Sequence, residues 1–267
     1  MRKINKIKLF INDNEKSKIV AKDLELELKK YDFEIVSRNY DLAISIGGDG
    51  SFLRMVKDTK FNEDIYYIGI NSGTLGFMQE VKVDEIDKFI DELKNNKYKV
   101  EEIGIQETIV KAKDSLYRFY SLNEIFIRYK NLKVVKLDIN IDNDLLERYL
   151  GDGILIASSS GSTAHNLSYG GSIVYNTFTS LQITPMGPIN SKVYRSLINS
   201  VIIPDKKEIT LIPEENHRNL IVTIDGENNF YDNVDNITTK IDDKKIKCLR
   251  LSHYNFPKKI NEKLLTD

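Results

Sequence analysis

The tetrapeptide Gly47-Gly48-Asp49-Gly50 constrains this chain more than any other feature of the sequence. It follows the apolar run 41–46 and precedes a predicted helix over 51–56. Glycines after a buried strand let the backbone approach a phosphate closely, and a helix N-terminus offers free N–H groups. A carboxylate there cannot attract phosphate, so Asp49 is expected to take a proton from a hydroxyl or to hold a metal ion. The pattern predicts phosphoryl transfer; the alternative is that Asp49 is only a helix N-cap.

Bulk properties exclude several classes of protein. The 267 residues suit one large domain or two modest ones. The formal charge of -1 gives no global electrostatic reason to expect nucleic-acid or membrane binding. The single Cys248 excludes an intramolecular disulfide and suits a reducing compartment. The basic start is too short for a signal peptide or membrane span, so we expect a cytoplasmic protein.

The first hundred residues alternate between strand and helix patterns. Short apolar runs predict strands at 6–11, 41–46 and 65–70, and apolar residues at helical spacing predict helices at 17–31 and 84–95. This alternation predicts a doubly wound α/β domain with a parallel sheet, whose ligands bind at the carboxyl ends of the strands. Gly47–Gly50 and the segment from Asn71 to Phe77 both fall at such ends.

After about residue 101 the pattern changes to period two. Val135, Leu137, Ile139 and Ile141 alternate with polar residues, which predicts an antiparallel, β-sandwich-like domain. We therefore expect an α/β domain at 1–101 and a β-rich dinucleotide-binding domain at 102–252, with the tail 253–267 packing back on the first domain. Further strands are predicted at 108–112, 145–149, 154–157, 209–211, 220–224 and 246–251.

Three other groups of residues are candidates for binding. Residues 158–168 combine hydroxyls with small residues, which let a flat ring approach the backbone; the alternative is a Ser/Gly-rich turn with a helix N-cap at Ser162 or Thr163. Asn123-Glu124 interrupts an apolar stretch and could bind sugar hydroxyls, or could be a polar strand edge. Arg54 could meet a phosphate or lie in solvent.

Several common catalytic motifs are absent from the sequence. It has no Gly-x-x-x-x-Gly-Lys-Ser/Thr loop, no Gly-x-Gly-x-x-Gly after the first strand and no Gly-x-Ser-x-Gly elbow. The three histidines are scattered and there is one cysteine, so no transition-metal site is indicated.

Taken together, the motifs resemble the NAD kinase family, in particular its short bacterial branch. The resemblance covers residues from about 41 to 226. Gly-Gly-Asp-Gly alone is shared with diacylglycerol and sphingosine kinases, whereas the ordered combination is highly specific. The motifs that carry it are Gly47–Gly50 with Ser51-Phe-Leu-Arg54, Asn71-Ser-Gly-Thr-Leu-Gly-Phe77, Asn123-Glu124, Gly151-Asp-Gly153, Gly161-Ser-Thr-Ala164, Thr184–Arg195 and Asp225-Gly226.

The resemblance implies ATP-dependent phosphorylation of the adenosine-ribose 2′-hydroxyl of NAD, with Mg²⁺ or Mn²⁺, by a homotetramer or dimer. Asp49 matches the catalytic base, Asn123 an adenine contact and Glu124 a contact to the other ribose. Asp152 matches a carboxylate near the nicotinamide, and Gly187 a residue that reaches a neighbouring subunit's site. The predicted nucleotide and substrate contacts are Gly47, Gly48, Asp49, Gly50, Arg54, Asn123, Glu124, Arg148, Asp152, Ser160, Thr163, Ala164, His165, Asn166, Leu167, Ser168 and Gly187.

The chain departs from the family pattern at four places. His165 stands where Tyr is usual, and Ser158-Ser159-Ser160 replaces Thr-Pro-Thr. Leu150 stands where many members have Arg, so Arg148 is considered as its substitute. Glu227 follows Asp225-Gly226 where Gln is common. None of these changes touches Asp49.

Two rival functions stay open at this point. A lipid or sphingoid kinase would share Gly-Gly-Asp-Gly, but it would need an acyl-chain pocket and a membrane-facing surface that the sequence does not show. A non-catalytic NAD(P)-binding sensor would keep the pocket, but it would have no need of Asp49.

Overall fold

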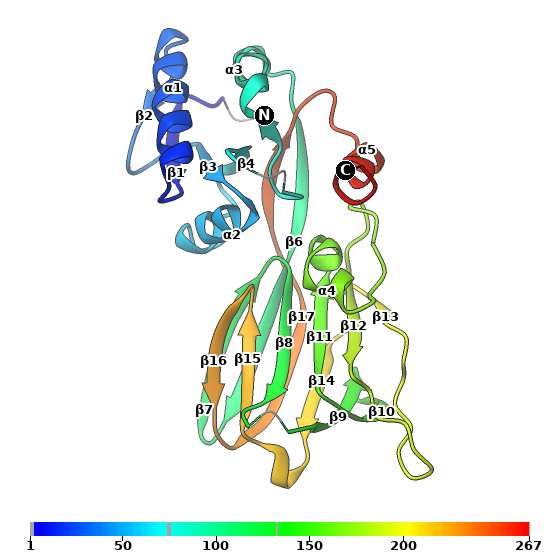
Figure 1. The fold of residues 1–267 in the computed structure, drawn as a ribbon. Coiled ribbons are helices and arrows are strands. Elements are labelled where there is room, and N and C mark those ends of the chain that lie inside the picture. The colour runs from blue at the N-terminus through cyan, green and yellow to red at the C-terminus, as the bar shows by residue number, and fades with distance from the viewer. Residues whose placement is uncertain (1–2, 74–75, 132, 267) are drawn as a thin grey trace. The chain divides into compact units, whose positions relative to one another are not determined.

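The computed structural model describes residues 3–73, 76–131 and 133–266, which form two compact units. The first unit comprises the residues up to Ile103 and those from Lys245 onward; the second is Gly104–Lys244. The chain passes between the units within two long strands, β6 (Lys99–Ala112) and β17 (Val234–Arg250) (Figure 1). The return at Lys245 comes earlier than the residue 252 expected from the sequence, because β17 continues into the first unit.

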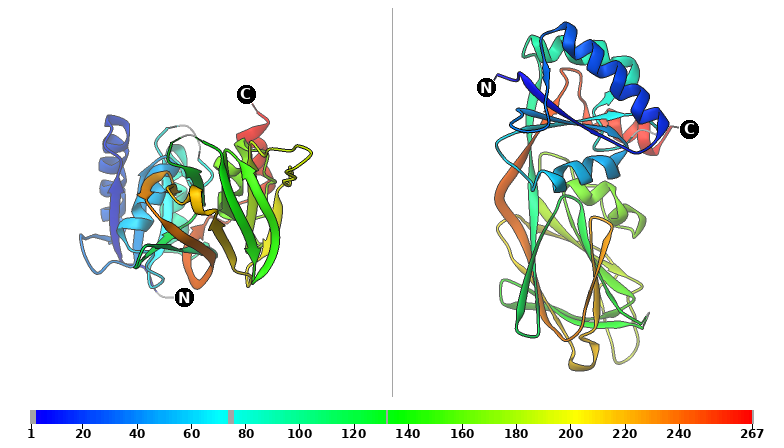
Figure 2. Two further views of the ribbon diagram at one scale, coloured as in Figure 1. Left: turned by 90° about the horizontal axis from the view of Figure 1, so that it is seen from below. Right: turned by 90° about the vertical axis from the view of Figure 1, so that its left-hand side faces the viewer.

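The first unit is built on parallel strands in the order β2-β1-β3-β4, with β5 and the end of β17 also pairing with β4. Helices α1 and α3 cover one face of this sheet and α2 covers the other (Figure 2). Its elements are β1 (Lys6–Ile11), α1 (Glu15–Lys30), β2 (Glu34–Ile35), β3 (Leu42–Gly47), α2 (Asp49–Asp58), β4 (Tyr66–Asn71), β5 (Val81–Lys82), the 3₁₀-helix η1 (Val83–Glu85), α3 (Ile86–Lys94) and α5 (Phe256–Leu264).

Local sequence explains these elements. Asn14 caps α1 by accepting a hydrogen bond from Ser17 N at 2.8 Å. Val20, Leu24 and Leu28 lie on one face of α1 and are buried against the sheet. Strand β3 is buried along its whole length, as expected for a strand covered by helices on both faces.

The second unit consists of two mainly antiparallel sheets that share one hydrophobic core. One sheet has the order β13-β12-β11-β8-β15-β16, and the other contains β10-β9-β14-β17 with the β6–β7 hairpin. Its further elements are β7 (Ser115–Ser121), β8 (Glu124–Tyr129), β9 (Val135–Ile141), β10 (Asp144–Gly151), β11 (Gly153–Ser158), η2 (Ser160–Thr163), α4 (His165–Ser168), β12 (Ser180–Met186), β13 (Val201–Pro204), β14 (Ile209–Pro213), η3 (Glu215–His217), β15 (Leu220–Ile224) and β16 (Glu227–Tyr231).

The predicted fold class, a doubly wound α/β domain with an antiparallel β-sandwich-like domain, is confirmed. The strand expected at 246–251 is present as the end of β17, but its assignment to the antiparallel domain was wrong: Lys247 and Cys248 pair in parallel with Tyr66 and Tyr67 of the first unit. The alternation there reflects the end of a strand in the parallel sheet, which periodicity alone cannot distinguish. Among the described helices, none has the length and apolar character needed to cross a membrane.

Candidate functional site

Asp49 is the first residue of α2, directly after the carboxyl end of β3. Its Oδ2 atom accepts a hydrogen bond from Phe77 N at 2.7 Å, and its Oδ1 atom accepts one from Met78 N at 2.9 Å. The N-cap of α2 is Gly48, so Asp49 is not capping the helix. A carboxylate oxygen can accept more than one hydrogen bond, so the group keeps acceptor capacity for a substrate hydroxyl.

Close packing around Asp49 explains why a glycine stands at position 76. A Cβ atom on Gly76 would lie 1.8 Å from Asp49 Oδ1, so no other residue fits there without moving the carboxylate. The predicted motif from Asn71 to Phe77 therefore meets Asp49 at its carboxyl end. Its members Thr74 and Leu75 lie outside the described residues.

The backbone around Asp49 leaves room for a ligand at two glycines. A Cβ atom on Gly48 would meet no atom within 4 Å, and one on Gly50 would approach only Arg54 at 3.8 Å. Gly47 ends β3 and packs against Ser51. Arg54 is exposed, and it donates to Asn12 Oδ1 at 2.7 Å and to Ser51 Oγ at 3.2 Å. Gly47, Gly48, Gly50 and Arg54 thus cluster at the start of α2, as the motif predicts.

In the second unit, the Asp225 carboxylate organises the start of β8. It accepts backbone hydrogen bonds from Leu122 (2.8 Å), Asn123 (2.8 Å) and Glu124 (3.2 Å). Burial raises the pKa of Asp225, although these three donors lower it. Asp225 and Gly226 form the two-residue turn between β15 and β16, both with positive φ, as Asp-Gly favours.

Asn123 and Glu124 each present a buried oxygen without a partner among the described residues. Asn123 is 7% exposed and Glu124 is 4% exposed. The unpaired atoms are Asn123 Oδ1 and Glu124 Oε2. Buried polar atoms are normally hydrogen-bonded, so two adjacent orphan acceptors indicate a place where a ligand supplies the donors. Asn123 lies just before β8, so strand alternation does not separate the two side chains.

The second oxygen of Glu124 contacts His165. His165 Nδ1 lies 2.9 Å from Glu124 Oε1. Burial raises the pKa of Glu124 to about 7, and the His165 contact opposes this shift without cancelling it. The imidazole that replaces the usual tyrosine therefore contacts a carboxylate predicted to bind ribose.

The loop after β11 approaches Asn123 closely. A Cβ atom on Gly161 would lie 2.0 Å from the carbonyl oxygen of Asn123, so only glycine fits. Ser158 links the loop to the residues before β8, because its hydroxyl donates to Leu122 O and accepts from Gly161 N. Ser159, at the predicted proline position, instead lies 3.0 Å from Ser180 through the two hydroxyl groups.

Asn166 has a different position from its neighbours in the loop. Its side chain is fully buried and bonds to Ser162 O, Gln182 Oε1 and Thr184 Oγ1 at 3.3, 3.3 and 2.6 Å. The amide therefore stabilises the loop, and its role as a ligand contact stays a prediction. The other predicted contacts of η2 and α4 are half-buried or exposed: Ser160, Thr163, Ala164, His165, Leu167 and Ser168.

Asp152 and Gly187 lie next to each other. Asp152 is exposed in the turn between β10 and β11, its N–H donates to Met186 O at 2.9 Å, and Gly187 packs against its carboxylate. Among the contacts of the described residues, none joins Arg148 to Asp152 or Gly187. Its exposed guanidinium is 3.7 Å from Asp138 Oδ1, in a hollow of about 670 Å³ that Leu150 also lines. The sequence spacing alone did not indicate the Asp138 partner.

The described residues form no cluster of three or more His, Cys, Asp or Glu side chains able to hold a metal ion. Mg²⁺ is commonly bound through one or two carboxylates together with substrate phosphates. The Asp49 carboxylate, with its remaining acceptor capacity, fits such an ion brought by a triphosphate.

Two features of the site were not predicted from the sequence. The amides of Phe77 and Met78 orient Asp49, and the Asp225 carboxylate binds the backbone of 122–124. Asp-Gly signals a hairpin turn, but nothing in the sequence shows which backbone groups its carboxylate meets.

Comparisons with known proteins agree with this geometry. Residues 7–98 match the ATP-NAD kinase N-terminal domain, and residues 122–243 match the ATP-NAD kinase C-terminal domain. An NAD kinase of Finegoldia magna is 40% identical over 255 residues, covering 91% of this chain and 92% of that protein. The chain belongs to the ATP-NAD kinase family. The NAD kinase of Leuconostoc mesenteroides is 31% identical over 264 residues, covering 98% of this chain and 99% of that protein.

Solved structures share the fold. A yeast NADH kinase, complexed with NADH, has a TM-score of 0.86 at 21% identity, over 100% of this chain and 91% of that one. An NAD kinase from Archaeoglobus fulgidus, in complex with ATP, has a TM-score of 0.72 at 21% identity, over 91% of this chain and 92% of that one. At this identity the likeness establishes the fold.

Proposed function

We propose that this protein is an NAD kinase, which transfers the γ-phosphoryl group of ATP to the adenosine-ribose 2′-hydroxyl of NAD and releases NADP and ADP. The observation that carries the proposal is the Asp49 carboxylate, held by two backbone N–H groups at the start of α2. A fixed carboxylate that keeps acceptor capacity suits a general base for a hydroxyl nucleophile.

Binding of NAD is assigned to the second unit. The orphan oxygen of Asn123 accepts from the adenine amino group, and that of Glu124 accepts from a hydroxyl of the other ribose. Residues 163–168 surround the adenosine, and Asp152 lies toward the nicotinamide. The 2′-hydroxyl gives its proton to Asp49 while its oxygen bonds to the γ-phosphorus, and the bond from that phosphorus to the bridging oxygen of ADP breaks.

The phosphoryl donor is proposed to be ATP with Mg²⁺ or Mn²⁺. The free N–H groups at the start of α2 and the open backbone at Gly48 and Gly50 favour phosphate binding. The divalent ion neutralises the charge of the triphosphate. Arg54 adds a cation at the same helix.

The protein is also proposed to form a homo-oligomer, which the family resemblance implies is a tetramer or a dimer. Residues 173–202 of the second unit expose large apolar side chains, including Phe178 (66%), Val193 (81%) and Ile198 (72%). Such exposure is typical of protein interfaces, and Gly187 lies within this stretch. Light scattering after size-exclusion chromatography tests it: a monomer mass would contradict the oligomer.

A cytoplasmic location is proposed because the substrates are ATP and NAD.

The deciding experiment offers one protein two acceptors. Purified protein is incubated with radiolabelled ATP and Mg²⁺, and with either NAD or diacylglycerol. Labelled NADP alone is the expected product. Labelled lipid would support the lipid kinase alternative, and calorimetric NAD binding without turnover under any divalent ion would support a sensor.

A further inference from the structure

The C-terminal helix α5 places a buried lysine beside the segment that orients Asp49. Asn255 caps this helix by accepting from Lys258 N at 2.9 Å, and Pro257 occupies its first turn. Lys259, on its inner side, is only 8% exposed. Lysine is rarely buried unless it is paired, so the contacts of the Lys259 ammonium indicate why it is buried here.

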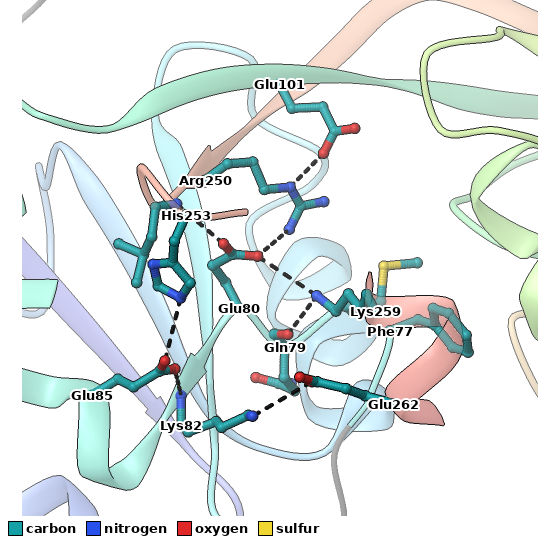
Figure 3. Close-up of polar contacts among 12 residues, drawn as sticks. Phe77, Gln79, Glu80, Lys82, Glu85, Glu101, Arg250, His253, Lys259 and Glu262 are labelled. Atoms are coloured by element: carbon teal, nitrogen blue, oxygen red, sulfur yellow. Dashed lines mark hydrogen bonds and ion pairs between the residues drawn. The ribbon is translucent and has the colours of Figure 1, made fainter. Parts of the chain in front are cut away.

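The Lys259 ammonium is fastened to residues 79 and 80. Its Nζ atom donates to the carbonyl oxygen of Gln79 at 2.8 Å and lies 3.6 Å from Glu80 Oε2 (Figure 3). Gln79 is itself completely buried, and its Nε2 atom donates to Gly48 O at 2.7 Å. Lys259 is thus connected through Gln79 to the residue that precedes Asp49.

The same segment makes the contacts that hold the Asp49 carboxylate. Phe77 N and Met78 N donate to its two oxygens, and the Gln79 side chain donates to the carbonyl oxygen of Gly48. Residues 77–79 therefore hold both the carboxylate of Asp49 and the backbone just before it. Lys259 anchors the carboxyl end of this segment. A shift of the segment would move the hydrogen-bond donors that orient the carboxylate.

Pairing of Glu80 does not require Lys259. Glu80 Oε2 also lies 3.3 Å from Arg250 Nη1, and Glu80 Oε1 accepts from Leu251 N at 3.1 Å. Arg250 also pairs with Glu101, so the buried guanidinium already contacts two carboxylates, Glu80 with a side chain 3% exposed and Glu101 with one 17% exposed. Burying a second cation, Lys259, costs desolvation energy. Because Glu80 already has partners, the need to pair Glu80 does not explain why Lys259 is buried there.

We propose that Lys259 is a positioning residue for phosphoryl transfer: its ammonium fixes residues 77–80, and these residues fix the Asp49 carboxylate. The inference rests on the proposed function of Asp49. It makes the C-terminal helix, which carries no recognised catalytic motif, part of the catalytic apparatus.

The proposal predicts a specific pH dependence. The pKa of Lys259 is lowered to about 8, mainly by burial and next by the Arg250 charge, while Glu80 and Asp49 oppose the shift. The Tyr254 ring, 5.4 Å from Nζ, faces it from the loop after β17. Since the protonated form holds two acceptors, turnover should fall as pH rises through about 8.

The test compares Lys259→Met and Lys259→Gln with Lys258→Met, a control on the same helix whose side chain is 69% exposed. Turnover and the KM for NAD are measured from about pH 6 to about pH 10, a range that spans the ordinary pKa of histidine and approaches that of lysine. Misplaced catalytic groups cost up to about a hundredfold, so we expect kcat of both Lys259 variants to fall about tenfold to a hundredfold. The KM for NAD should stay near wild type, and the fall near pH 8 should disappear.

A second readout does not depend on activity. Hydrogen exchange of a peptide covering residues 76–80 should be faster in the folded Lys259 variants than in the wild type and in Lys258→Met. Wild-type kcat and exchange in the Lys259 variants would overturn the proposal. Loss of folding in both variants, seen by circular dichroism, would also overturn it, because Lys259 would then support the fold as a whole. Absence of NADP formation by the wild type would instead overturn the proposed function.

Discussion

His165 Nδ1 lies 2.9 Å from Glu124 Oε1, so the histidine that replaces a family tyrosine contacts a buried carboxylate. Burial raises the pKa of this carboxyl to about 7. An ionised carboxylate accepts hydrogen bonds from ribose hydroxyls better than a neutral one, so the charge state of Glu124 should control NAD binding.

We expect NAD affinity to increase with pH through the range in which Glu124 ionises. Calorimetric titration should give a dissociation constant about tenfold higher near pH 6 than near pH 8. Glu124→Gln, which cannot ionise, should bind weakly and show a flat profile. A wild-type affinity that is constant across this range would contradict the assignment of Glu124.

The same carboxyl should affect folding stability in the opposite direction. Its pKa is raised from 4.5 in the unfolded chain to about 7 in the fold, so the folded state favours the protonated form. Its contribution to the free energy of unfolding is therefore fully present below about pH 4.5 and is lost as pH rises through about 7. Urea denaturation of the wild type and of Glu124→Gln, at several pH values in this range, checks the prediction. The difference between their free energies of unfolding should change with pH, and a constant difference would contradict the prediction.

Gly76→Ala should inactivate the enzyme without unfolding it. The added Cβ would lie 1.8 Å from Asp49 Oδ1, so the carboxylate must move. A misplacement of a catalytic group by about 1 Å can cost about a hundredfold, so we expect a loss of this size in kcat. Steady-state kinetics give the loss, and a thermal unfolding curve close to wild type shows that the fold is retained. A fully active Gly76→Ala variant would show that Asp49 does not need this position.

Asp225→Asn should destabilise the second unit and weaken NAD binding. The substitution replaces an acceptor of three backbone hydrogen bonds by an amide with one acceptor atom. Buried donors left unpaired cost about 1–3 kcal/mol. Asp232→Asn is the matched control, because Asp232 is half exposed and pairs with Lys130 at 3.2 Å, a contact worth about 0–1 kcal/mol. Equal effects of the two substitutions, measured by urea denaturation, would contradict the role of Asp225.

Much of the fold could be predicted because its local signals agree with its packing. Lys6–Ile11 and Leu220–Ile224 are strands with the predicted bounds. In the second of them Leu220, Val222 and Ile224 are buried, as period-two alternation predicts. The end of β17 could not be assigned, because Ile246 to Arg250 alternates as an antiparallel strand does, yet pairs in parallel with β4. The partner of a strand depends on contacts distant in sequence.

The candidate site was predictable in its residue types and less so in its connections. Gly-Gly-Asp-Gly located Asp49 because the motif needs a strand end followed by a helix. The contacts of Asp49 with Phe77 and Met78, and of Lys259 with Gln79, join residues far apart in the chain, and no local pattern encodes them.

The central claim is that Asp49 takes the proton of the NAD 2′-hydroxyl. The most direct test is a coupled assay of NADP formation by wild type and Asp49→Asn, with NAD, ATP and Mg²⁺, alongside calorimetric NAD binding. The wild type should form NADP, and Asp49→Asn should bind NAD normally while its kcat falls by about a hundredfold or more, the usual effect of losing a general base. Turnover of Asp49→Asn near that of the wild type would contradict the claim.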